Sequence, residues 1–328
     1  MTTIGITHDG ASHECGETDL DLKRVVEALR ELGQVVDLPV DSELPRRLRD
    51  DDIDIACNLA RGSTGHYHRF QVAALFEHFQ IPYTGAHARA HETTGSRFRF
   101  KEALHAHDVP SAAYSVVRSR ADLAALRRRR FPMAIFRSRN LPQPGERFIA
   151  RDVVELETLC DPLLLDGEPI MVEPHVEASF ACLLIGNGRS RSMLPPLAID
   201  WGTTSDRRPV VERVPVGMLE ELDGISRRAA DAVGCRDWTL VEVGLSEGGV
   251  PTVVSVDTLP LIGCTRAGDL VTLATQSAGL EMRELVQRCL LAAAERSHVP
   301  LPQAPAMSRL PRFTPPRGLP AYAPRERA

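Results

Sequence analysis

The sequence predicts a mixed protein in which an α/β unit with a parallel sheet precedes smaller α+β units. Three observations support this fold class. Residues 1–80 alternate strand-like and helix-like segments, which is typical of a parallel sheet with helices on both faces. From Thr93 to about Glu177 shorter elements follow, in an α+β pattern. The stretch Gly234–Cys264 then contains two apolar strands around a turn-forming cluster, which predicts a hairpin.

Residues 1–80 contain five expected elements whose lengths and apolar spacing fit strand–helix alternation. The helix that ends at Leu32 is followed by Gly33, a residue that commonly terminates helices. Ligands of parallel sheets bind at the carboxyl ends of the strands, where the loop His8–Cys15 falls. The expected strands are Thr3–His8, Gln34–Val40 and Ile53–Leu59, and the expected helices are Asp19–Leu32 and Phe70–Phe79.

The elements after Thr93 are shorter and include several strands. The helix Arg99–His107 is expected to end before Val109-Pro110, because the residue before a proline avoids helical backbone angles. Leu219–Val233 has an apolar helical face and is followed by Gly234, and Glu281–Arg296 is expected to form a closing helix. The remaining expected elements are strands at Tyr114–Val117, Phe131–Arg137, Ile170–Pro174 and Ser179–Leu184, and a helix at Ser119–Arg129.

The predicted hairpin carries two carboxylates. Its strands, Thr239–Leu245 and Val250–Val256, are joined by Ser246-Glu247-Gly248-Gly249; Glu242 lies within the first strand and Asp257 closes the second. Two adjacent antiparallel strands can bring such side chains to one face. A pair of oxygen ligands there could hold Mg²⁺ against a nucleotide phosphate. The alternative is that both carboxylates are ordinary solvent-facing strand residues.

Composition limits the function classes. A chain of 328 residues is long enough for two or three domains with cores of their own, and 43% hydrophobic with 25% charged residues is typical of a globular protein. The net charge of −5 argues against a general nucleic-acid binder. Without a membrane-spanning stretch, a signal-like N-terminus or CxxC pairs among the seven cysteines, we expect a cytoplasmic protein with neither membrane association nor a disulfide framework.

Several phrases of the sequence resemble those of one family. These are GCRDW at Gly234–Trp238, DTLP at Asp257–Pro260, IPYTG at Ile81–Gly85 and Asn58-Leu59-Ala60. Together they resemble the D-alanine–D-alanine ligases, which have the ATP-grasp fold. The resemblance implies a Rossmann-like (pre-ATP-grasp) parallel-sheet domain over residues 1–92, a central α+β ATP-grasp lobe over 93–177 and a C-terminal α+β lobe over 178–298. The Pro- and Arg-rich tail over 299–328 is expected to be disordered.

The resemblance also implies an activity, namely ATP- and Mg²⁺-dependent formation of an amide bond between two amino acids through an acyl phosphate. Glu14 matches the glutamate that contacts the ammonium of the first substrate; taken alone, it would be a surface residue beside a helix-capping Ser12. The implied partners are therefore small amino-acid or peptide substrates, and the family also forms dimers. The other implied site residues are Arg97, Lys101 and Arg137 around the phosphates, Glu173 and Val176 in the adenine-binding hinge, Arg207 in the closing loop, and Glu242 and Asp257 as metal ligands.

The nucleotide region departs from the family pattern. Phe136 occupies the position of an adenine-side lysine, and the adjacent Arg137 can replace that lysine only if the strand bulges. The glycine- and serine-rich phosphate loop of the family is replaced by Asn140–Gly145, whose two prolines remove backbone donors. Arg97 stands in place of a phosphate-binding lysine and keeps its charge.

The reaction centre departs as well. Ser179 replaces the glutamate that binds ribose, and Ser255 replaces the carboxylate that bridges two metal ions. Leu240 replaces an arginine that donates to the oxyanion, a loss that typically costs about 3 kcal/mol of transition-state stabilisation. Leu261 replaces a glycine next to the substrate. The sequence phrases that resemble the family are therefore retained, whereas the positions expected to carry out the chemistry differ from the family.

Three hypotheses remain open at the level of sequence. The first is a divergent ATP-grasp carboxylate–amine ligase in a specialised pathway. The second is a pseudo-ligase that binds an amino acid, a peptide or a protein partner without turning over ATP. The third is an ATP-independent enzyme that reuses the cleft, with His13, His66 and His68 as acid–base groups. Solvated loop histidines are the alternative for these three residues.

Overall fold

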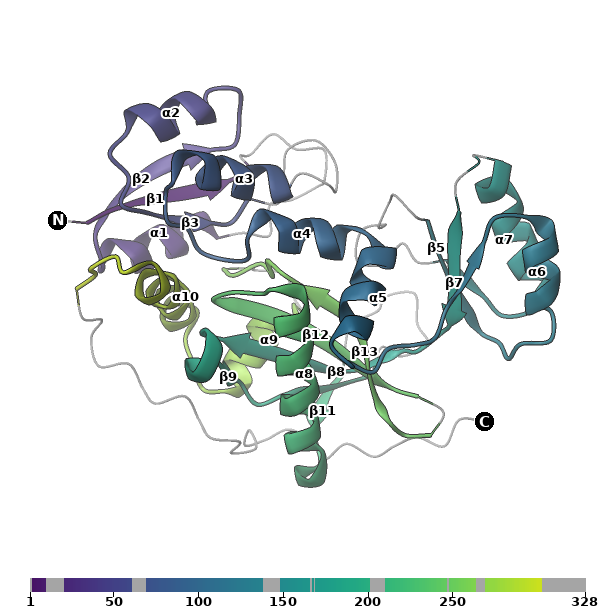
Figure 1. The fold of residues 1–328 in the computed structure, drawn as a ribbon. Helices are drawn as coiled ribbons and strands as arrows, with labels where there is room; N and C mark the ends of the chain where they lie inside the picture. The colour runs from purple at the N-terminus through teal and green to yellow at the C-terminus, as the bar shows by residue number, and fades with distance from the viewer. Residues whose placement is uncertain are drawn as a thin grey trace.

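The chain folds into three sheet-containing lobes (Figure 1). A computed structural model describes residues 2–9, 21–60, 69–137, 148–165, 167, 169–200, 210–246, 248–263 and 269–302. Across these residues, each lobe has one sheet, and the three sheets follow one another along the chain. This is the mixed α/β and α+β architecture that the sequence predicts.

The N-terminal lobe contains a parallel sheet in the order β2-β1-β3. On one face, Ile4 and Ile6 of β1 share a core with the helices α1 and α10, because alternate strand residues point to the same side. On the other face, Ala56 of β3 packs with the helices α2 and α3. The elements are β1 (Thr3–His8), α1 (Leu22–Arg30), β2 (Gln34–Pro39), α2 (Leu44–Asp50), β3 (Ile55–Asn58) and α3 (Arg69–Phe79).

The central lobe has a four-stranded antiparallel sheet in the order β4-β7-β5-β6. Ile135 and Val172 belong to the core that α6 and α7 cover. The intervening residues, Phe136 and Glu173 among them, fall on the opposite face of the sheet. The elements are β4 (Ser115–Val117), α6 (Arg120–Leu126), β5 (Met133–Arg137), β6 (Phe148–Ala150), α7 (Val153–Leu165) and β7 (Ile170–Pro174).

Two helices, α4 (Ala88–Gly95) and α5 (Arg97–Ala106), connect the N-terminal lobe to the central one. Figure 1 shows them lying between these lobes and above the C-terminal sheet. Phe100 and Leu104 of α5 pack in the core of the C-terminal lobe, whereas the side chain of Arg97 reaches the central lobe. Helix α5 therefore places charged side chains, Arg97 and Lys101, at the junction of two lobes.

The C-terminal lobe contains a six-stranded sheet in the order β11-β10-β8-β12-β13, with β9 paired to β8. Helix α8 covers one face, and helices α9 and α10 cover the other. Helix α8 ends at Gly234, whose φ of 83° is a left-handed conformation that favours glycine. The elements are β8 (Ala178–Ile185), η1 (Gly188–Ser190), β9 (Ser192–Met193), β10 (Leu197–Asp200), β11 (Val210–Arg213), η2 (Val216–Met218), α8 (Leu219–Val233), β12 (Trp238–Leu245), β13 (Pro251–Asp257), α9 (Leu270–Ser277) and α10 (Met282–Ser297).

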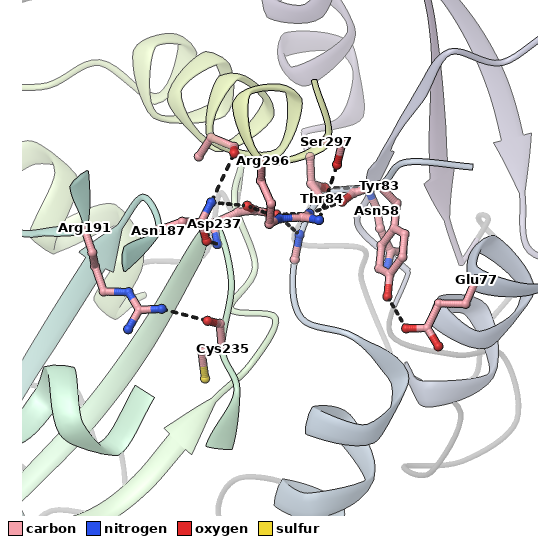
Figure 2. A network of polar contacts seen from close by, with 12 residues as sticks. Asn58, Glu77, Tyr83, Thr84, Asn187, Arg191, Cys235, Asp237, Arg296 and Ser297 are labelled. Atoms are coloured by element: carbon pink, nitrogen blue, oxygen red, sulfur yellow. Dashed lines mark hydrogen bonds and ion pairs between the residues drawn. The ribbon is translucent and has the colours of Figure 1, made fainter. Parts of the chain in front are cut away.

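A buried carboxylate joins the N-terminal and C-terminal lobes (Figure 2). Asp237 precedes β12 and is fully buried. Its Oδ2 accepts a hydrogen bond from the backbone N–H of Gly85 at 2.8 Å, and its Oδ1 accepts one from Asn187 Nδ2 at 2.8 Å. Arg296 of α10 donates to both oxygens, at 3.2 and 3.0 Å, and also to the carbonyl of Tyr83 at 2.8 Å. The phrases IPYTG and GCRDW, which are far apart in sequence, therefore meet at Asp237.

Two further properties follow from the described residues. None of the helices among them is both long enough and apolar enough to cross a membrane. The cysteines in the same residues are free thiols buried in the cores. Burial raises the pKa of Cys57 to about 12, so this thiol is protonated and unreactive at neutral pH.

Replacing Asp237 with asparagine should destabilise the fold. Every partner of the Asp237 side chain is a donor, so the new amide NH₂ would face N–H groups, and Arg296 would lose its counter-charge. We expect the free energy of unfolding to fall by about 3 kcal/mol, measured by urea denaturation. Asp161→Asn, which alters the exposed pair with Arg120, should cost about 1 kcal/mol or less. Equal losses in the two variants would contradict a special role for Asp237.

Candidate active site

A line of polar contacts runs along the last strand of the C-terminal sheet. The carbonyl of Val254 accepts from Arg97 Nη1 at 2.8 Å, and Ser255 Oγ donates to a carboxylate oxygen of Glu242. At the end of the strand, Arg69 Nη1 donates to Asp257 Oδ1 at 2.7 Å. With about 3.3 Å per strand residue, these contacts span about 10 Å. We call this set the β13 track, comprising Val254, Ser255 and Asp257 with their partners Arg97, Glu242 and Arg69.

The strand register places the two predicted metal ligands on one face of the sheet. Leu240 lies opposite Asp257, and Glu242 lies opposite Ser255. Glu242 and Asp257 are therefore diagonal neighbours across β12 and β13. The register shifts after Glu242, so the pairing from Leu240 to Glu242 is continuous and fixes this face.

Arg69 is a site residue that the sequence reasoning missed. It is the first residue of α3, in the N-terminal lobe, yet it pairs with Asp257 of the C-terminal lobe. About a quarter of each side chain is exposed, so the pair lies at an accessible junction. Asp257 Oδ1 also accepts from the backbone N–H of Leu259 at 3.0 Å, which fixes the carboxylate. The one sequence signal was an arginine beginning the helix that follows β3 along the chain.

A buried histidine supports the same end of the track. His91 of α4 makes a hydrogen bond through Nδ1 to Thr258 Oγ1 at 2.7 Å. Burial, and next the positive charge of Arg69, lower the pKa of His91 to about 4. His91 is therefore neutral at neutral pH, and Arg69 carries the positive charge beside Asp257.

At the other end, Glu173 of β7 is bound by two cations. Arg97 pairs with Oε1, and Lys101 Nζ lies 2.8 Å from Oε2. Lys101 also donates to the carbonyl of Ala112 at 2.7 Å. All three charged side chains are buried. The structure thus brings together Arg97, Lys101 and Glu173, which the sequence placed in the nucleotide site.

Arg97 is additionally held between aromatic rings. Its guanidinium carbon lies 4.5 Å from the ring centroid of Phe136 and 5.3 Å from that of Phe100. Such stacking stabilises a cation by about 1–2 kcal/mol when water is excluded. Phe136 thus takes part in holding Arg97.

The remaining sequence-predicted residues have different positions. The pairing of β5 with β7 is regular at Phe136 and Arg137, so Arg137 falls on the face opposite Glu173, and the bulge that would redirect it is not formed. Val176 lies against Gly244 of β12. A Cβ atom on Gly244 would lie 2.5 Å from the Cγ1 atom of Val176. Glu14 and Arg207 lie outside the described residues, as do His13, His66, His68, residues 140–145 and residues 303–328.

The donor set fits one Mg²⁺ ion. Mg²⁺ is commonly bound by one or two carboxylates together with substrate phosphates, and Glu242 and Asp257 share a face at the edge of the track. No group of three or more acidic, histidine or cysteine side chains that could enclose a metal occurs among the described residues. The nucleotide end fits less directly, because Arg97 and Lys101 are both paired with Glu173.

Lys101 predicts a specific dependence of stability on pH. Burial outweighs the attraction of Glu173 and lowers the pKa of Lys101 from 10.5 to about 8. Between these two values the unfolded chain binds more protons than the folded one, so the contribution of Lys101 to the free energy of unfolding increases as the pH rises. The free energy of unfolding of the wild type minus that of Lys101→Met, both from urea denaturation, should therefore become more positive between pH 8 and 10. For the exposed Lys23→Met, we expect a constant difference; a constant one for Lys101→Met would contradict the lowered pKa.

Comparison with known proteins identifies the fold. No family model matches the chain. It is 26% identical over 299 residues to a D-alanine–D-alanine ligase of Pseudomonas entomophila, covering 86% of this chain and 90% of that protein. It is 26% identical over 306 residues to that of Moorella thermoacetica, covering 85% and 96%. The crystal structure of the Bacillus anthracis D-alanine–D-alanine ligase complexed with ATP superimposes with a TM-score of 0.71 at 17% identity, covering 91% and 99%. By sequence, the chain is similar to D-alanine–D-alanine ligases over most of its length, and it has their ATP-grasp fold.

Proposed function

We propose that this protein is an ATP-dependent ligase that forms an amide bond between two amino-acid or peptide substrates. The observation that carries the proposal is the β13 track, in which Arg69 of the N-terminal lobe, Arg97 of the connecting helix α5, and Glu242 and Asp257 of the C-terminal lobe lie along one strand. The curated relatives are named D-alanine–D-alanine ligases, and the chain spans 90% and 96% of the length of the two described above. Glu14, outside the described residues, is the candidate for the substrate ammonium, and Arg207 for the closing loop.

The residues of the candidate site would have separate tasks. Bound Mg-ATP would supply the phosphoryl group that activates the carboxylate and the ion that neutralises the phosphates. Glu173 keeps acceptor capacity while bound to two cations, since a carboxylate has about four lone-pair sites, and so it would read an adenine amino group. Glu242 and Asp257 would hold the metal ion, and Val176 would border the hinge.

The changed positions favour substrates or a pathway other than cell-wall synthesis. Leu240 and Ser179 do not present the donor and the carboxylate that the resembling family has at these positions. Leu240 lies on the face of the sheet that carries Glu242, and Ser179 lies at the register shift of β8 against β12. Because the framework contacts around Asp237 are independent of these positions, the fold can persist while the specificity changes.

A pseudo-ligase is the second candidate, and one observation favours it. Arg97 is buried, stacked on Phe136, paired with Glu173 and bound to the carbonyl of Val254. A phosphate would have to compete with these contacts for the guanidinium. In that case the cleft would retain its shape for an amino acid, a peptide or a protein partner without turnover of ATP.

Calorimetric titration with Mg-ATP separates the two candidates. We expect wild-type protein to bind Mg-ATP with micromolar affinity, about −8 kcal/mol, because both ends of the track contribute contacts. The double variant Glu242→Gln, Asp257→Asn should lose Mg²⁺-dependent binding, since it removes both anionic ligands. Amino-acid pairs are then screened by phosphate release.

The matched control is Glu43→Gln, Asp50→Asn, which removes two carboxylates from an exposed arginine cluster in α2 and should leave binding unchanged. If wild-type protein gives neither heat nor a thermal shift up to millimolar Mg-ATP, the ligase proposal is wrong and the pseudo-ligase is preferred.

A further inference from the structure

Amide formation from an acyl phosphate needs a hydrogen-bond donor at the carbonyl oxygen. The amine nitrogen attacks the carbonyl carbon, a C–N bond forms and the oxygen becomes an oxyanion. Collapse of this intermediate breaks the C–O bond to phosphate, which leaves with the bonding electrons, while the amine proton passes to solvent. A cationic donor lowers the energy of the charged intermediate. In this chain the side chain of Leu240, on the β12–β13 hairpin, cannot donate.

The strand pairing brings a guanidinium to the neighbourhood of Leu240. Leu240 on β12 lies directly opposite Asp257 on β13, and directly opposed side chains have Cβ atoms about 5 Å apart. Arg69 Nη1 lies 2.7 Å from Asp257 Oδ1. The guanidinium of Arg69 therefore stands on the face of Leu240 and Asp257, although it comes from the first residue of α3 in another lobe.

Arg69 is better placed than Arg97 or Lys101 to donate a hydrogen bond to a substrate oxygen. Arg97 and Lys101 are both bound to Glu173 and are almost fully buried. Arg69 is about one-fifth exposed, and its pair with Asp257 uses one nitrogen of a guanidinium that has five N–H groups. Asp257 is itself fixed by the backbone N–H of Leu259. The ion pair thus holds a charged donor in place without consuming it.

We propose that Arg69 is a catalytic residue that donates to the oxyanion, replacing from α3 the donor that position 240 lacks. The inference rests on the proposed ligase activity. It assigns Asp257 a second task, because its carboxylate orients the guanidinium as well as bordering the metal site. It also explains how an amide-forming site can operate with leucine at position 240.

The test separates donation in the transition state from a purely structural ion pair. Arg69→Gln should lower kcat for amide formation by about 100- to 1,000-fold, while calorimetry gives an Mg-ATP affinity within about twofold of wild type. Arg69→Lys, which keeps the charge but not the planar geometry, should be intermediate. Added guanidinium ion should partly restore kcat in Arg69→Ala.

Arg283→Gln serves as the matched control. Arg283 makes an exposed interlobe pair with Glu31 at 3.0 Å, away from the track, so kcat should be unchanged. Unchanged kcat in Arg69→Gln would overturn the proposal. So would a loss of folding or of ATP binding in both Arg69→Gln and Arg69→Lys, because Arg69 would then be a structural clamp. If wild-type protein neither binds ATP nor releases phosphate, the ligase function itself fails, an outcome visible before any variant is made.

Discussion

The carboxylate of Asp237 is the contact on which the arrangement of the lobes depends. It is fully buried and binds only donors, from the turn that includes Gly85, from Asn187 and from Arg296 of α10. A buried charge is stable only when its hydrogen bonds are satisfied, so these segments must be in register for the chain to fold. The N-terminal lobe is thereby fixed against β12. That placement allows Arg69 of α3 to reach Asp257 of the neighbouring strand.

Strand β13 is then contacted by charged side chains from the N-terminal lobe, the connecting helix α5 and the C-terminal lobe. Its residues are contacted by Arg97 next to the central lobe, by Glu242 of the C-terminal sheet and by Arg69 of the N-terminal lobe. Each contact falls at a different residue of the strand, so the regular rise of β structure sets their spacing. A site assembled this way depends on the relative position of the lobes and changes whenever that position changes.

The charged cluster at the nucleotide end of the site stabilises the fold, but its contacts also engage the cations that a phosphate would need. Glu173 is neutralised by Arg97 and Lys101, and Arg97 is stacked on Phe136. Removing Glu173 would leave two buried cations without a counter-charge, which explains why this residue can be kept independently of catalysis. The same contacts restrict the cations that a phosphate would need. The ligase and the pseudo-ligase differ in whether these contacts open for ATP.

The sequence alone determined the fold class and many of the main elements, because apolar periodicity and helix-terminating glycines act locally. Strand β1 and helix α8 have the predicted bounds, and the hairpin places Glu242 and Asp257 on one face as its pattern indicated. Helix α7 was not among the expected elements; it contains Pro162, a residue that disfavours helix interiors, and its apolar side chains pack in the central core. Only the tertiary structure decided that Arg137 faces away from Glu173 and that Arg69 pairs with Asp257. Both depend on strand register and on contacts between distant segments, which no local pattern encodes.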